Sequence, residues 1–121
     1  MEKSKILICD DELGVRESLK LILERDYETI LVSDGDEALE ALKADKTIKA
    51  VLLDIKMPKT DGLEILKQLK QINRALAVIM VTGYQTTEMA AEAIKYGAVD
   101  YIIKPINSGA VLSAVHKALH K

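Results

Sequence analysis

Short apolar runs alternate with amphipathic stretches along the whole chain. Five runs are compact and apolar, which is typical of strands buried in a parallel sheet. They cover residues 5–9, 27–32, 50–53, 77–81 and 99–103. The spacing between them leaves room for a helix after each run, so the pattern predicts five strands and five helices.

The segments after the five runs repeat apolar residues every three or four positions, which is helical spacing. The first lies over residues 13–25, and the last carries Val111, Leu112, Val115 and Leu119 on one face. This alternation favours an α/β fold in which helices pack on both faces of a doubly wound parallel sheet. No linker, repeat or low-complexity segment interrupts it, so residues 1–121 are expected to form a single domain.

Local signals mark where several helices begin and end. Asp34 with Glu37, and Asp61 with Glu64, have the spacing of a capping box. Residues 58–62 are expected to form a loop. The fourth helix is expected to end at a glycine, Gly97. Two residues can cap the last helix, and the alternatives are Asn107 and Ser108.

Composition indicates in which compartment the domain works and which classes of partner it lacks. Apolar residues make up 49% and charged residues 30%, a soluble globular profile. The longest apolar run, 75–81, is too short to span a bilayer, and the N-terminus lacks a signal-peptide layout. Cys9 is the one cysteine, which favours a reducing cytoplasm. The net charge of −2 gives no sign of a basic surface patch, so we expect no direct nucleic-acid contact and no membrane partner.

Polar residues stand at the ends of four of the five predicted strands. They are Asp10 with Asp11, Asp54, Thr82 and Lys104. Each has an ordinary explanation when taken alone, as a helix cap, a turn residue or a solvated lysine. Together they would meet at the carboxyl edge of the sheet, where open α/β sheets bind ligands.

The chemistry of this set points to a cation and a phosphoryl group. Three crowded carboxylates repel one another unless a cation neutralises them. A hard dication with oxygen ligands fits, Mg²⁺ best, and the absence of a His or Cys cluster argues against zinc. Asp54 can then act as a nucleophile on phosphorus. Lys104 would neutralise the phosphoryl oxygens, and Thr82 could donate a hydrogen bond to one of them.

These residues resemble the receiver domain of bacterial two-component response regulators, over essentially the whole chain. The matching positions are Asp10-Asp11, Asp54, Met57-Pro58, Asp61-Gly62, Thr82-Gly83, Tyr101 and Lys104-Pro105. Residues 82–84 and 97–101 are similar to the nitrogen-regulation branch of transcriptional activators. The resemblance implies a flavodoxin-like strand order, 2-1-3-4-5.

The resemblance also implies roles for these residues. Asp54 would accept a phosphoryl group from the phosphohistidine of a sensor histidine kinase. Asp11, Asp54 and the backbone carbonyl of Lys56 would hold Mg²⁺, with Asp10 acting partly through water, and Mn²⁺ is expected to substitute. Thr82 and Lys104 would contact the phosphoryl group. The Lys104–Pro105 peptide bond would be cis, which costs little before proline.

A switch is expected to follow phosphorylation. Movement of Thr82 towards the phosphoryl group would let the Tyr101 ring rotate inward. The surface formed by the fourth helix, fifth strand and fifth helix would then signal to the chain's own output domain or a partner protein, with transcription regulation as the expected output. A homodimer is also expected to form on phosphorylation. Lys56, Gly83 and Tyr84 are expected to tune hydrolysis. The domain would not be a conventional enzyme, although it would catalyse its own phosphorylation and dephosphorylation.

Three other interpretations compete with this one. A phosphatase of the haloacid dehalogenase type needs an Asp-x-Asp pattern after the first strand, whereas residues 9–12 read Cys-Asp-Asp-Glu. A flavodoxin-like cofactor module needs a neutral phosphate loop there, and two aspartates would repel a phosphate. A receiver-like interaction module that is never phosphorylated would have no need of the acidic set.

Overall fold

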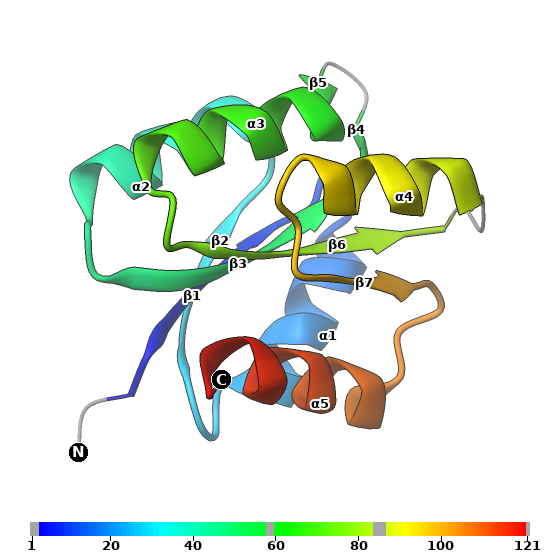
Figure 1. The fold of residues 1–121 in the computed structure, drawn as a ribbon. Coiled ribbons are helices and arrows are strands. Elements are labelled where there is room, and N and C mark those ends of the chain that lie inside the picture. Colours follow the sequence, from blue (N-terminus) through cyan, green and yellow to red (C-terminus); the bar gives the residue numbers. More distant parts are fainter. Residues whose placement is uncertain (1–2, 58–59, 84–86, 121) are drawn as a thin grey trace.

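A five-stranded parallel sheet forms the centre of the molecule (Figure 1). The computed structural model describes residues 3–57, 60–83 and 87–120. The strands are β1 (Lys5–Cys9), β2 (Glu28–Val32), β3 (Ile48–Asp54), β6 (Ala77–Thr82) and β7 (Asp100–Ile103). Their order across the sheet is β2-β1-β3-β6-β7, which is the predicted order 2-1-3-4-5 when these five are counted along the chain. The predicted fold class is confirmed.

Helices cover both faces of the sheet. Helices α1 (Leu13–Leu23) and α5 (Ser108–Leu119) pack on one face, and α2 (Gly35–Ala44), α3 (Gly62–Ile72) and α4 (Thr87–Lys95) pack on the other (Figure 1). None of the helices in the described part of the chain has the length and apolar character needed to cross a bilayer.

Side chains of the central strands alternate between the two faces, as a period of two requires. Those that face α2, α3 and α4 are Leu7, Cys9, Val51, Leu53, Val78 and Met80. Those that face α1 and α5 are Ile6, Ile8, Ala50, Leu52, Ile79 and Val81. Because both faces are buried, these strands read as continuous apolar runs in the sequence.

The loop predicted over residues 58–62 contains part of a small hairpin. Strand β4 (Lys56–Met57) pairs antiparallel with β5 (Thr60–Asp61), and α3 begins at Gly62. The first helix also ends earlier than predicted, at Leu23, because the amides of Asp26 and Tyr27 turn back to the Leu23 carbonyl.

The predicted caps of two helices are confirmed. Asp34 accepts a hydrogen bond from the Glu37 amide at 2.8 Å, and Asn107 rather than Ser108 caps α5 through the Ala110 amide at 3.0 Å. The Glu37 carboxylate reaches back to the Ser33 amide at 2.7 Å, one residue before the usual partner.

The third predicted cap forms only in part, while the predicted helix end at Gly97 is confirmed. Asp61 accepts from the Leu63 amide at 2.9 Å, but the side chain of Glu64 contacts Gln68 and Lys67. Gly97 has a φ of 107°, which favours glycine, and the amides of Gly97 and Ala98 bond back to Ile94 and Ala93.

Candidate functional site

Asp10 is an almost fully buried carboxylate at the carboxyl end of β1. It is 1% exposed, and its Oδ1 accepts a hydrogen bond from the Glu12 amide at 2.9 Å. Its Oδ2 accepts no hydrogen bond from the described residues and has only an ion pair, 3.2 Å from Nζ of Lys104. Burial raises the pKa of Asp10, and the Glu12 amide and Lys104 offset this rise only partly.

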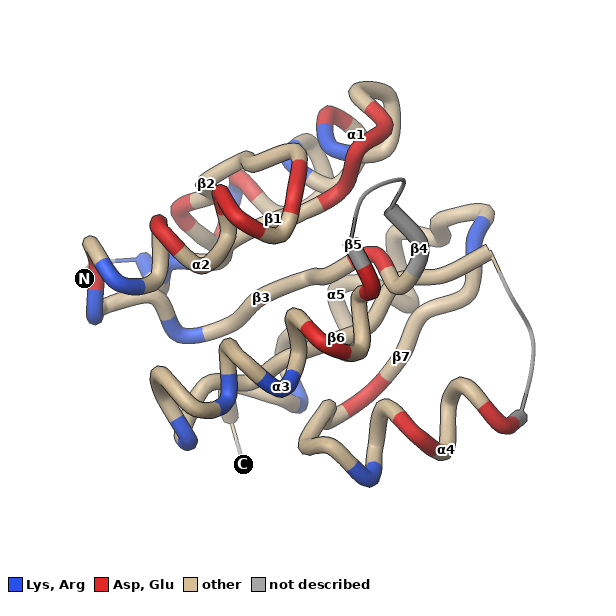
Figure 2. Tube along the Cα trace, turned by 90° about the horizontal axis from the view of Figure 1, so that it is seen from above, with Lys and Arg blue, Asp and Glu red and all other residues tan. Residues whose placement is uncertain are grey.

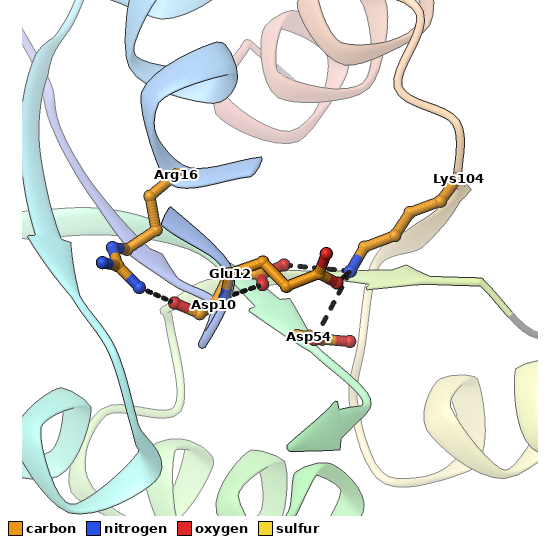
Figure 3. A network of polar contacts seen from close by, with 5 residues as sticks. All are labelled: Asp10, Glu12, Arg16, Asp54 and Lys104. Carbon is orange, nitrogen blue, oxygen red and sulfur yellow. Dashed lines mark hydrogen bonds and ion pairs between the residues drawn. The ribbon is translucent and has the colours of Figure 1, made fainter. Parts of the chain in front are cut away.

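Lys104 follows β7 directly and brings one ammonium group to three carboxylates (Figure 3). Its Nζ lies 3.2 Å from Asp10, 3.2 Å from Glu12 and 3.5 Å from Asp54. Burial lowers the pKa of Lys104, but attraction by Asp54 and Asp10 outweighs burial and leaves the pKa raised. The lysine therefore stays charged and serves as the counter-ion of the cluster.

Asp54 is the last residue of β3 and is only 3% exposed. The backbone after it is held on two sides, because the Ile55 amide donates to the Val81 carbonyl at 3.2 Å and the Ile55 carbonyl accepts from the Gly62 amide at 3.0 Å. A Cβ at Gly62 would lie 2.5 Å from the Ile55 carbonyl oxygen. The close contact between α3 and the segment after Asp54 therefore requires glycine.

Four carboxylates converge at this edge of the sheet. Asp10, Asp11, Glu12 and Asp54 each offer a ligand atom, and these atoms lie within 4.8 Å of one another. Asp10 and Asp54 are buried, whereas Asp11 and Glu12 are exposed. The oxygen-only donor set and the buried Asp10 oxygen that accepts no hydrogen bond fit a hard dication such as Mg²⁺.

Thr82 and Tyr101 lie in neighbouring strands but differ in exposure. Thr82 ends β6 and is 3% exposed, and its carbonyl accepts from the Lys104 amide at 2.7 Å. Tyr101 pairs with Met80 in the sheet register and is 41% exposed. The structure thus has the Tyr101 side chain at the surface. Gly83, directly after Thr82, is exposed.

Two residues near the cluster were not predicted from the sequence. Glu12 contributes to the carboxylate cluster and pairs with Lys104. Arg16, one helical turn further on, donates from Nη1 to the Asp10 carbonyl at 2.7 Å (Figure 3). Glu12 directly follows Asp10 and Asp11 in the sequence, and this position could have predicted that Glu12 belongs to the carboxylate cluster. Nothing in the sequence pattern distinguishes Arg16 from an ordinary surface residue of α1.

Some predicted residues fall partly or wholly outside the described part of the chain. Tyr84 and Pro58 lie outside it, as does the side chain of Lys56. The backbone of Lys56 forms β4, two residues after Asp54. The Lys104–Pro105 peptide bond is cis.

Comparisons with known proteins point to one family. The family model described as "Response regulator receiver domain" matches residues 6–116. The transcriptional regulatory protein ZraR of Escherichia coli (strain K12) is 36% identical over 115 residues, which cover 94% of this chain and 26% of ZraR. The chain thus spans about a quarter of the length of the first curated relatives it matches.

Two further similar proteins differ in how much of their length this chain covers. Sporulation initiation phosphotransferase F of Bacillus subtilis (strain 168) is 36% identical over 120 residues, covering 98% of this chain and 96% of that protein. The crystal structure of NtrX from Brucella abortus has a TM-score of 0.90 and 33% identity, covering 97% of this chain and 27% of NtrX.

The similarity to ZraR and NtrX confirms the resemblance to the nitrogen-regulation branch of activators. The match to the family model covers most of the chain, including all four strand ends that carry the polar residues of the site. The chain therefore belongs to the response regulator receiver domain family.

Proposed function

We propose that the chain is a phosphorylation-dependent signalling switch in which Asp54 is the phosphoryl acceptor. The observation that carries the proposal is the position of Lys104, whose single ammonium group lies within 3.5 Å of a buried Asp54 and 3.2 Å of a buried Asp10. A cation held beside a buried carboxylate can stabilise negative charge that develops on an incoming phosphoryl group.

The proposed reaction is an in-line transfer. An Oδ atom of Asp54 attacks the phosphorus of a phosphohistidine, the P–N bond breaks, and the electron pair leaves with the imidazole nitrogen. Lys104 exchanges part of its contact with the carboxylates for contact with a phosphoryl oxygen. Thr82 donates its hydroxyl hydrogen to another.

Four groups are proposed to hold Mg²⁺: Asp11, Asp54, the backbone carbonyl of Lys56, and Asp10 partly through water, with Mn²⁺ as a substitute. When bound, the ion neutralises phosphoryl oxygens and the crowded carboxylates. The buried Oδ2 of Asp10, which accepts no hydrogen bond from the described residues, and the convergence of the cluster support this assignment.

Intact-mass measurement tests the acceptor. The chain incubated with acetyl phosphate and Mg²⁺ should gain one phosphoryl group, and a chelator should prevent the gain. Asp54→Asn should abolish it. Asp36→Asn, the same change at an exposed residue of α2, should leave it intact. An adduct that persists in Asp54→Asn would refute the assignment.

The proposed switch couples Thr82 to Tyr101. Movement of Thr82 towards the phosphoryl group would open space for the Tyr101 ring, which is exposed at the surface. Fluorotyrosine labelling tests this, because the Tyr101 resonance should move on phosphorylation in the unaltered chain and stay in place in Thr82→Val. An unchanged Tyr101 resonance in the phosphorylated chain would contradict the coupling.

The proposed partners are a sensor histidine kinase and an output domain or partner protein, which binds the surface formed by α4, β7 and α5. The chain is also proposed to form a homodimer on phosphorylation. Regulation of transcription by a cytoplasmic regulator is the proposed output, supported by the similarity to ZraR. A phosphoryl-carrier role is the second candidate, because sporulation initiation phosphotransferase F matches over 96% of its own length. Transfer of label from phosphorylated Asp54 to a histidine phosphotransferase would favour the second.

Autodephosphorylation is proposed to depend on three residues, Lys56, Gly83 and Tyr84, of which Gly83 is exposed beside the site. The half-life of the phosphorylated chain should change in Lys56→Ala and in Tyr84→Ala. An unchanged half-life in both would remove this proposal.

A further inference from the structure

The two histidines of the chain are His116 and His120, and both lie at the end of α5. Their spacing of four residues places them on one side of the helix. The His120 amide donates the last helical hydrogen bond, to the His116 carbonyl at 3.0 Å, so the second histidine is the C-cap residue that directly follows α5. Both side chains are exposed.

The two imidazole rings already lie against each other. Their centroids are 4.4 Å apart, and the ring planes differ by 28°. Nitrogen ligands bind transition ions at about 2 Å, so two nitrogens that share one ion must approach to within about 4 Å of each other. Rotation of two exposed side chains can bring ring nitrogens to that separation without movement of the backbone.

We propose that His116 and His120 form a chelating site for one divalent transition-metal ion, such as Cu²⁺, Ni²⁺ or Zn²⁺. Imidazole nitrogen suits these ions, whereas Mg²⁺ takes oxygen ligands. The carbonyl groups at the carboxyl end of a helix carry partial negative charge, which favours a cation at this position. Water completes the coordination.

This site is separate from the carboxylate cluster. Helix α5 begins just after Lys104, beside the cluster, and runs back along the sheet, so its carboxyl end lies towards the opposite edge (Figure 1). The two sites also differ in ligand chemistry, because the cluster offers carboxylates and the α5 pair offers imidazoles. The chain can therefore bind two cations of different class independently.

Calorimetric titration with Ni²⁺ tests the proposal. Ni²⁺ avoids redox chemistry with Cys9, and excess Mg²⁺ is added to compete with Ni²⁺ for the carboxylate cluster. One Ni²⁺ should bind per chain. His116→Gln and His120→Gln should each weaken binding about a hundredfold, because each removes one arm of the chelate. Lys117→Gln, a change at the exposed residue next to His116, should bind as the unaltered chain does.

Thermal unfolding gives a second readout. Ni²⁺ should raise the unfolding midpoint of the unaltered chain and of Lys117→Gln, but of neither histidine variant, because only a ligand bound to the folded state stabilises it. Equal Ni²⁺ binding by the unaltered chain and both histidine variants would overturn the proposal, since the ring contact would then be a stack only. One ion per two chains with dimer formation would also overturn it, in favour of a site between chains.

Discussion

At the scale of single residues, the site is an arrangement of charge that the fold alone does not favour. Asp10 is 1% exposed, and one of its oxygens has only an ion pair with Lys104. Lys104 is shared with Glu12 and Asp54, so one positive charge faces three negative ones. Burying charge without full compensation costs stability, and the cost is accepted here because the site needs those charges.

Asp10→Asn should therefore stabilise the metal-free chain. The raised pKa of Asp10 means that its ionised form destabilises the fold at neutral pH, a penalty lost as pH falls through that pKa. We expect the free energy of unfolding to rise by about 1 kcal/mol at pH 7. Urea denaturation in the presence of a chelator measures this, with Asp36→Asn as the exposed control.

Mg²⁺ should reverse that order. The unaltered chain gains stability by mass action from a bound ion, whereas Asp10→Asn has lost part of the donor set and gains less. If, in the absence of Mg²⁺, Asp10→Asn were less stable than the unaltered chain, this account of Asp10 would be contradicted.

Cys9, which directly precedes Asp10, also has a shifted pKa. Burial is the largest cause and repulsion from Asp34 the second, and the pKa of the Cys9 thiol is raised to about 12. The Sγ atom of Cys9 also donates a hydrogen bond to the Asp34 carbonyl at 3.3 Å. Because the thiolate is the reactive form, the native thiol should react with Ellman's reagent at pH 8 far more slowly than the urea-unfolded chain. Equal rates in the two states would show that the structure around Cys9, at the end of β1, opens freely.

At the scale of elements, the sequence pattern predicts the main strands and helices, but it does not predict the close contacts between them. The five apolar runs predicted the sheet, and residues placed at strand ends predicted Asp10, Asp54, Thr82 and Lys104 as neighbours. The short β4–β5 hairpin was missed, because two-residue strands carry no periodicity. Arg16 was missed because its contact is with a backbone carbonyl, which leaves no trace in a side-chain pattern.

Gly62 shows how one contact between elements positions the site. A Cβ there would meet the Ile55 carbonyl oxygen at 2.5 Å, whereas a Cβ at Gly14 would meet nothing within 4 Å. Gly62→Ala should lower the free energy of unfolding by about 1–3 kcal/mol, because α3 must move away from the segment after Asp54.

Gly14→Ala is the matched control, and it should stabilise α1 by up to about 1 kcal/mol, since alanine is the better helix former. Urea denaturation of both variants measures the contrast. Equal effects at the two positions would show that α3 adapts without cost to the added methyl group.

At the scale of the whole molecule, the two edges of the sheet differ in charge: one gathers carboxylates, and the other is richer in lysine. Acidic residues gather where the strands end, near the start of α1 and β5 (Figure 2). The opposite edge has a hollow of about 1090 Å³, and the charged residues of its lining are four lysines and two glutamates: Lys3, Lys5, Lys46, Lys49, Glu24 and Glu28. The carboxylate site needs no such volume, because an ion and a phosphoryl group are small.

Acid should weaken the lysine-rich edge in a defined pH range. Lys5 Nζ lies 2.8 Å from Asp45, and the hydrogen bonds from Lys5 and then Thr47 lower the pKa of Asp45 from 3.8 to about 2. A lowered folded-state pKa means that the stabilisation is present above pH 3.8 and is lost as pH falls towards about 2.

Lys5→Gln should therefore be less stable than the unaltered chain at pH 5, and the difference should shrink as pH falls from about 4 to about 2. Lys46→Gln, at an exposed lysine of the same edge to which the described residues offer no ion pair, should show no such convergence. Chemical denaturation across this pH range measures all three chains. A pH-independent difference for Lys5→Gln would mean that Lys5 stabilises the edge by packing of its alkyl chain, and the ion pair with Asp45 would then contribute nothing.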